Sequence, residues 1–310
     1  MRNMINKIVC LILLLSFPIL AQKVTVVEIM KLEIGIEQEI AYPKFTADDN
    51  KIIFTSPNFQ GLYKYDLTSG DIEIISNGMG AGYNPRILND GNIYYKTFDL
   101  INGRKLYSIN KYNSITGKNE VLDVNVRLAK IPFQRTWDEV YYLNNSVIKK
   151  QSMEKTLSKS NESDIAVYVE NNDLILINGN EKILLNPLGK GVYVWESISP
   201  DGKSLLFSFG NQGTFVININ GQLILNIEEA HYPRFSPDGK YISFMKDKDD
   251  GHNYTESDIF IYSIEDEESY KVTDTEDRIE MYPNWSNDGT KLVYHTIEGE
   301  LFVAELKYDN

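Results

Sequence analysis

The stretch YPRFSPDGKYISF, residues 232–244, decides the fold because close copies of it recur along the chain. Most copies begin with an aromatic residue, continue into a turn rich in Asp, Asn and Gly, and end on an apolar or aromatic residue. Self-similarity of this kind predicts a repeat architecture. The other copies are YPNWSNDGTKLVY (282–294), WESISPDGKSLLF (195–207), YPKFTADDNKIIF (42–54) and, more loosely, YNPRILNDGNIYY (83–95).

Each copy predicts a short strand, a tight turn and a second strand. In the clearest copies the turn is Pro-Asp-Gly or Asn-Asp-Gly, where Gly adopts the positive φ of a hairpin and Asp bonds to the turn backbone. Two more strands follow in most units, for example in GTFVININGQLILNI (213–227). Four antiparallel strands repeated about every 40 to 50 residues are typical of a β-propeller. The predicted fold class is therefore all-β.

The spacing of the repeats predicts the number of blades. A sixth, degenerate copy occupies residues 131–142, and the interval from Pro132 to Glu196 is too long for one blade. It contains seven candidate strands, among them one at 155–159, where two blades need eight. Seven four-stranded blades are favoured, and six blades with a long insertion are the alternative.

The N-terminus has the pattern of a secretory signal peptide. Arg2 and Lys7 precede an apolar run over 8–20, and Ala21 supplies the small residue at a cleavage site. We therefore expect residues 1–21 to be a signal peptide and 22–310 to form a single propeller domain. A strand-like segment at 23–34 precedes the first repeat and is expected to complete the last blade, which closes the ring.

Composition and charge narrow the class of protein. The chain has 310 residues, 42% of them hydrophobic, and a formal net charge of −13. Loss of Arg2 and Lys7 with the signal peptide would change this charge to −15. Such a charge repels nucleic acid and anionic lipid, so neither nucleic acid binding nor stable membrane insertion after cleavage is expected. Cys10 is the only cysteine, and a periplasmic or secreted chain without disulfides is predicted.

The repeat resembles that of the TolB-like β-propellers, on the pattern at 232–244, 282–294 and 42–54. The resemblance covers the mature chain and implies a bacterial exported propeller. Related propellers also serve as domains of prolyl-oligopeptidase-type peptidases. That activity needs an α/β-hydrolase domain with a G-x-S-x-G motif, which this sequence does not contain.

Polar residues that follow the repeat proline predict a binding site in the central channel. Lys44, Arg86 and Arg234 alternate with apolar strand residues, so they are expected to face the channel and to attract an anionic ligand. Alternatively, they solvate the channel wall and pair with acids. The candidate channel residues are Lys44, Arg86, Glu196, His231, Arg234 and Glu280.

Two groups of residues in the sequence resemble metal sites. The chain resembles oligogalacturonate lyases, which implies a metal held by histidines, but His231, His252 and His295 are expected to act as isolated polar side chains. The loop DKDDGHNYTE (247–256) resembles a calcium loop with a spacing one residue short of the EF-hand pattern. Its candidate Ca²⁺ ligands are Asp247, Asp249, Asp250 and Glu256, and a solvated acidic loop is the alternative.

Together these patterns favour an exported, non-catalytic binding or scaffolding propeller, with no catalytic residues assigned. Its expected partner is an envelope protein, a peptide or a glycan bound at a propeller face. The alternative is a metal-assisted polysaccharide lyase or hydrolase using the His231 face. Trp137, Trp195, Trp285 and the twenty tyrosines suggest carbohydrate stacking, but most of these aromatic residues are expected to pack between blades.

Overall fold

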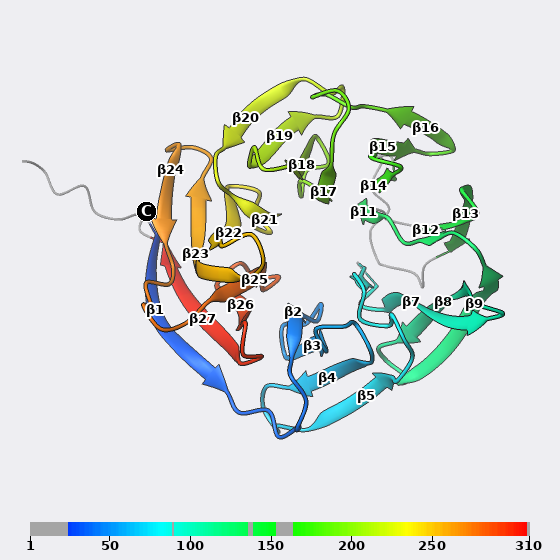
Figure 1. Cartoon of the computed structure of the whole chain (residues 1–310), viewed down its shortest axis with the longest axis horizontal. Coiled ribbons are helices and arrows are strands. Elements are labelled where there is room, and N and C mark those ends of the chain that lie inside the picture. The colour runs from blue at the N-terminus through cyan, green and yellow to red at the C-terminus, as the bar shows by residue number, and fades with distance from the viewer. Residues whose placement is uncertain (1–23, 89, 136–138, 153–163, 309–310) are drawn as a thin grey trace, which may run out of the picture.

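The computed structural model describes residues 24–88, 90–135, 139–152 and 164–308. All regular elements within these ranges are β-strands, and they form seven separate antiparallel sheets. Figure 1 shows these sheets arranged as blades around a central axis. The predicted all-β, seven-bladed propeller is confirmed. The described residues include no helix long and apolar enough to cross a membrane.

The strands are named in chain order. Blade 1 contains β2 (Ala41–Phe45), β3 (Lys51–Thr55), β4 (Leu62–Asp66) and β5 (Ile72–Ser76). Blade 2 contains β6 (Arg86–Ile87), β7 (Ile93–Ile101), β8 (Arg104–Asn113) and β9 (Lys118–Val126). Blade 3 contains β10 (Ala129–Lys130), β12 (Glu139–Asn144) and β13 (Val147–Ser152), and blade 4 contains β11 (Phe133–Arg135), β14 (Ile165–Glu170), β15 (Asp173–Asn178) and β16 (Glu181–Leu184).

The remaining blades are regular. Blade 5 contains β17 (Tyr193–Ile198), β18 (Ser204–Phe209), β19 (Thr214–Asn218) and β20 (Leu223–Ile227). Blade 6 contains β21 (His231–Phe235), β22 (Tyr241–Asp249), β23 (Tyr254–Ser263) and β24 (Glu268–Lys271). Blade 7 contains β25 (Glu280–Trp285), β26 (Lys291–Thr296), β27 (Leu301–Tyr308) and β1 (Val24–Leu32).

Blades 3 and 4 explain the long interval in the repeat. Strand β10 pairs with β12, whereas β11, which lies between them in sequence, pairs with β14 of the next blade. The chain thus supplies the innermost strand of blade 4 before it completes blade 3. The interval contains two blades, which excludes the six-bladed alternative. The strand expected at 155–159 lies outside the described residues.

The two ends of the described chain meet in blade 7. Strand β1 pairs antiparallel with β27, from Val24 opposite Tyr308 to Leu32 opposite Leu301. Figure 1 shows β1 in blue beside β27 in red, at the outer edge of the blade. The outer edge of β27 is therefore covered by a strand from the other end of the chain.

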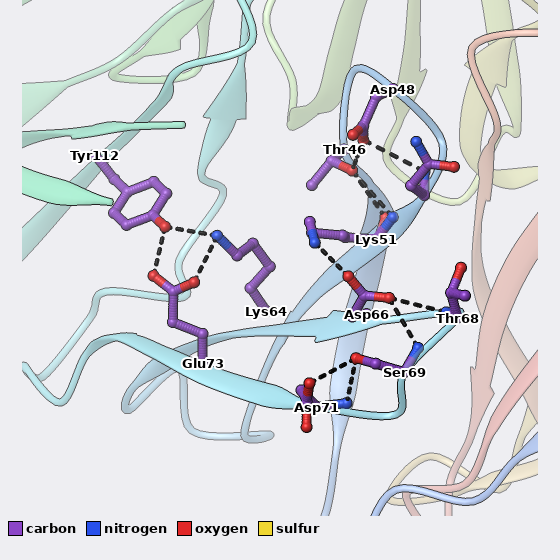
Figure 2. A network of polar contacts seen from close by, with 11 residues as sticks. Thr46, Asp48, Lys51, Lys64, Asp66, Thr68, Ser69, Asp71, Glu73 and Tyr112 are labelled. Atoms are coloured by element: carbon purple, nitrogen blue, oxygen red, sulfur yellow. Dashed lines mark hydrogen bonds and ion pairs between the residues drawn. The ribbon is translucent and has the colours of Figure 1, made fainter. Parts of the chain in front are cut away.

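The Pro-Asp-Gly turn is held by one recurring hydrogen-bond pattern. Ser236 Oγ donates to Asp238 Oδ1 (2.6 Å), which also accepts the Lys240 backbone N–H (3.0 Å), and Gly239 has φ 72°. Figure 2 shows the corresponding bond in blade 1. The same 2.6 Å bond joins Thr46 to Asp48, Ser199 to Asp201 and Ser286 to Asp288. The Pro-Asp-Gly motif therefore has a structural role, which is to hold the turn between the first two strands of a blade.

The core lies largely between neighbouring blades. Phe207, Phe244 and Tyr294 end their copies of the repeat and are almost completely buried. One cluster combines Met245 of blade 6 with Leu292 of blade 7. These side chains sit on alternate positions of strands whose two faces both pack against neighbouring sheets. The repeat thus places its apolar residues where blades meet.

Polar contacts also join neighbouring blades. Figure 2 shows Lys64 of blade 1 between Glu73 of the same blade and Tyr112 of blade 2. The distance from Lys64 Nζ to Glu73 Oε2 is 2.7 Å, and both groups also bond to the Tyr112 hydroxyl. At blade 7, Trp285 Nε1 donates to the Arg234 carbonyl of blade 6 (3.1 Å). Trp285 therefore packs between blades, as expected.

Candidate functional site

The inner strands enclose a cavity of about 390 Å³, called the central cavity below. Residues from all seven blades, or from the loops that lead into them, line it. Its single carboxylate comes from Glu196, and no histidine lines it within the described part of the chain. Five cationic side chains line it: Lys44, Arg86, Lys96, Lys130 and Arg234. Positive charge is therefore concentrated here in a protein whose net charge is −13.

These five cations are held by backbone carbonyl groups. Lys44 Nζ donates to the carbonyl of Pro85 in the neighbouring blade (2.9 Å). A neutral carbonyl orients a cation without cancelling its charge, so most of the positive charge stays available to a ligand. The other bonds are Lys96 to Ala129 (3.3 Å), Lys130 to Val169 (2.6 Å), Arg86 Nε to Ile131 (3.4 Å) and Arg234 to Trp195 (3.2 Å).

Burial and mutual repulsion lower the pKa values of three cations. Burial lowers the pKa of Arg86 to about 10. The Glu196 carboxylate, 3.7 Å from the guanidinium, acts in the opposite direction and raises that pKa. Burial, followed by the charges of Lys130 and Arg86, lowers the pKa of Lys96 to about 8. Burial and two guanidiniums bring the pKa of Lys44 well below its usual value. Arg86 thus stays charged at neutral pH, whereas burial and like charge favour the neutral amine form of the two lysines more than in water.

Strained aromatic residues form part of the cavity wall. Tyr42, Trp195, Tyr232 and Tyr282 have φ values of 54°, 59°, 51° and 57°, in the left-handed region that bulky residues avoid. Each lies on an inner strand at a break in the strand register. A β-bulge re-aims a side chain, and strain of about 1–3 kcal/mol per residue persists only where surrounding packing enforces it. The bulges bring these side chains to the central cavity.

The aromatic rings follow one another along the cavity wall. We call this series of six rings, from Trp195 to Tyr83, the aromatic arc. The three strained tyrosines form its middle. Its ring faces offer apolar contact to a flat ligand, while the hydroxyl groups remain polar. The centroid distances are 5.9 Å for Trp195–Tyr232, 4.7 Å for Tyr232–Tyr282, 4.6 Å for Tyr282–Tyr42, 4.8 Å for Tyr42–Phe59 and 5.0 Å for Phe59–Tyr83.

A second recess, of about 610 Å³, adjoins the central cavity and shares Val194 and Trp195 with it. It is lined by His231, whose Nδ1 lies 2.6 Å from Asp247 Oδ1. The Asp247 carboxylate raises the pKa of His231 above its usual value, against the effect of burial. His231 is therefore an oriented imidazole beside the cavity rather than a part of its lining.

The three histidines do not form one centre. His252 lines the same recess as His231. His295 is buried elsewhere, with its ring stacked on Tyr282 at 5.4 Å and 4°. No group of three or more His, Cys, Asp or Glu side chains that could hold a metal ion occurs within residues 24–308 as far as the structure describes them.

The acidic loop 247–256 forms the tip of the β22–β23 hairpin. Asp249 accepts the Gly251 N–H (2.8 Å), and Asp250 accepts the N–H groups of His252 (2.9 Å) and Asn253 (2.8 Å). The other two candidate Ca²⁺ ligands have separate partners, Asp247 with His231 and Glu256 with Lys248 (2.6 Å). The carboxylates therefore stabilise the turn and its flanks and do not surround a common point.

The sequence located part of the site. Lys44, Arg86, Glu196 and Arg234 meet in the central cavity, as expected. His231 lies in the adjoining recess. Glu280 is fully buried away from the cavity, where Thr275 Oγ1 donates to it (2.7 Å).

Sequence reasoning missed Lys96, Lys130 and the aromatic arc. Trp195 packs against Tyr232 of the neighbouring blade and also lines the cavity, while Trp137 lies outside the described residues. The Tyr that recurs before the repeat proline, at Tyr42, Tyr232 and Tyr282, was the sequence signal for the arc.

The fold and the site define a seven-bladed propeller with a cationic central cavity. No family model matches the chain, and no curated protein matches it. Among solved structures it is similar to an oligogalacturonate lyase from Vibrio parahaemolyticus, with 12% identity and a TM-score of 0.50. It is also similar to an oligogalacturonate lyase in complex with manganese, with 13% identity and a TM-score of 0.51. Each likeness covers 88% of this chain and 79% of the other.

At these identities the likeness shows the fold. The expectation of a non-catalytic scaffold is contradicted, because both of these structural neighbours are lyases.

One structural neighbour is in complex with manganese. Manganese is suited to carboxylate, carbonyl and water ligands. The described lining of the central cavity offers one carboxylate, and the described part of the chain contains no group of three or more His, Cys, Asp or Glu side chains that could hold a metal ion. These residues do not fit a manganese centre, so no catalytic step is derived through a metal.

Proposed function

We propose that this chain cleaves acidic oligosaccharides by β-elimination in the central cavity. The observation that carries this proposal is the group of basic side chains, Arg86 and Arg234 among them, that line the central cavity and bond to carbonyls in an acidic protein. Elimination removes the proton next to a uronate carboxylate and expels the glycosidic oxygen, leaving a carbon–carbon double bond. The reaction needs a cation to stabilise charge on the carboxylate and a base to take the proton.

Named residues fit each role. Arg86 and Arg234 can hold the carboxylate, because guanidinium groups bind carboxylates through paired hydrogen bonds. Glu196, 3.7 Å from Arg86, positions that guanidinium. Lys96 is the base, since its pKa of about 8 lies near a working pH. The aromatic arc stacks against the sugar rings.

Elimination is favoured over hydrolysis by the same lining. Glycoside hydrolases usually use two carboxylates on opposite sides of the bond. The described cavity lining contributes Glu196 alone, and that group is engaged with Arg86. The names of the two structural neighbours support the same choice, with a uronate oligomer as the substrate class.

The pH dependence of the reaction tests the role of Lys96. Only the neutral amine accepts a proton, so kcat/KM on oligogalacturonates should be highest above pH 8 and fall as the pH drops through about 8. Lys96→Met should lower kcat by about 100-fold or more. Ultraviolet absorbance of the unsaturated product measures the rate.

The control for this experiment is Lys203→Met, because the Lys203 side chain is 80% exposed and lies outside the cavity. Wild-type rates in Lys96→Met, or no absorbing product from any uronate oligomer, would contradict the proposal.

We also propose that the protein is exported and related to the TolB-like propellers. The composition of residues 1–21 supports export, and the repeat at 232–244 supports the relationship. Mass spectrometry of the protein from a bacterial envelope fraction, compared with the medium, tests cleavage after Ala21 and the destination.

A further inference from the structure

Lys44 has the surroundings of an uncharged amine. It lies on the inner strand β2 and faces the central cavity, where two guanidiniums, Arg86 and Arg234, repel positive charge on it. Its hydrogen-bond partner is the neutral carbonyl of Pro85 (2.9 Å). No carboxylate lies within ion-pair distance of Lys44 Nζ in the described part of the chain. Burial and like charge together favour the neutral form.

The neighbouring Lys96 differs in a way that matters for reactivity. Its ammonium lies over the rings of Tyr83 (4.8 Å) and Tyr107 (5.4 Å), and such ring faces stabilise a cation. Lys44 and Lys96 both have cations as charged neighbours, but none of the described aromatic rings lies under the Lys44 ammonium in this way. A lysine next to another cationic group in a desolvated pocket is a known arrangement for nucleophilic amines. Lys44 is thus the better nucleophile of the two.

We propose that Lys44 is a reactive amine that forms an imine with small 2-oxo acids in the central cavity. The amine lone pair adds to the ketone carbon, and proton transfer gives a carbinolamine. The carbonyl oxygen then leaves as water with both amine hydrogens, and a carbon–nitrogen double bond remains. No oxidant or reductant is consumed.

The two guanidiniums define the ligand class. Arg86 and Arg234 attract the carboxylate of a 2-oxo acid, which directs the adjacent ketone toward Lys44. A cavity of about 390 Å³ accepts such a small acid. A 4,5-unsaturated uronate whose ring opens is also a 2-oxo acid, so products of the proposed elimination belong to this class. That link rests on the proposed function, but the reactivity of Lys44 does not.

The test is reductive trapping of the folded full-length protein with pyruvate and borohydride, followed by peptide mapping. Borohydride converts the imine into a stable secondary amine with a fixed mass increase. We expect Lys44 to be labelled at least about tenfold more than the exposed Lys203, because each unit of pKa decrease raises the neutral fraction about tenfold. A neutral ketone, butanone, should label Lys44 less than pyruvate does.

Variants separate the possible results. Lys44→Arg keeps the charge and should abolish the cavity label, whereas Lys203→Arg should leave it unchanged. Because peptide mapping locates the label in the wild type, the test holds even where Lys44→Arg fails to fold. Labelling of Lys44 no greater than that of Lys203, or labelling of Lys96 in its place, would overturn the proposal. Since pyruvate is the probe, the result is independent of any lyase assay.

Discussion

His295 is enclosed by aromatic rings and cannot gain a proton easily. Its ring stacks on Tyr282 and meets the edge of Tyr42 at 5.5 Å. Nδ1–H donates to the Thr296 carbonyl (2.9 Å), while the buried Nε2 has no partner among the described residues. Burial lowers the pKa of His295 to about 4. This residue supports the aromatic arc from behind, and it stays neutral at physiological pH.

Replacement of His295 should change the acid stability of the protein. In the unfolded chain the histidine binds a proton near pH 6.5, whereas in the folded protein it does so near pH 4. Stability is therefore lost as the pH falls from 6.5 to 4, by roughly 3 kcal/mol. His295→Phe should remove that loss, as urea denaturation at pH 7, 5.5 and 4 would measure. A variant with the same pH dependence as the wild type would contradict this account.

The hairpin turns act at the scale of the element. In blade 6 the Asp238 carboxylate bonds to both the Ser236 hydroxyl and the Lys240 backbone N–H, so it fixes the turn that connects β21 to β22. The turn also contacts its neighbour, since Gly239 faces Pro200 of blade 5. One short motif thus sets both the strand register within a blade and the fit between blades.

Loss of the turn carboxylate should destabilise the protein modestly. Asp238→Ala removes two hydrogen bonds, which should lower the free energy of unfolding by about 1–2 kcal/mol. Asp277→Ala is the matched control, because that side chain is 87% exposed. Urea denaturation followed by circular dichroism measures both. Equal unfolding midpoints for the two variants would argue against the structural role of the turn.

The features that sequence predicted are those encoded locally. The turn at 236–239 and the alternating strands carry their own signals, so the blades could be located one by one. The placement of β11 in blade 4 depends on its pairing with β14, which is distant in sequence. No local sequence pattern specifies that pairing. The cavity lysines missed by sequence show the same limit. Lys96 belongs to a second strand, and Lys130 lies where the repeat is degenerate.

At the scale of the whole molecule, the charge distribution and the closed ring act together. The surface of an acidic protein repels anions, while the central cavity gathers cations from blades 1, 2, 3 and 6. Such a cavity exists only while the ring is closed, because each cation bonds to a carbonyl of a neighbouring blade. Closure depends on the pairing of β1 with β27. Stability of the ring and geometry of the site are therefore linked.

Removal of strand β1 tests this link. A chain that begins at Glu33 loses the buried Val24 and Leu32 and uncovers β27, whereas a chain that begins at Val24 keeps both. The shorter chain should lose at least about 3 kcal/mol of stability and self-associate through the exposed strand edge. Thermal unfolding and light scattering compare the two chains. Identical melting temperatures would show that closure by β1 is dispensable.

The pairing of β1 with β27 also has a consequence for biosynthesis. The ribosome makes β1 before the other described strands and β27 after them, so β1 stays unpaired while the strands between them are translated. At elongation rates of about 5–20 residues per second this delay is on the order of 15 to 60 s. During this time the strand exposes an apolar segment that includes Val27, Ile29 and Met30. We expect a holding chaperone to bind such a segment. The ring is thus completed only after β27 has been made.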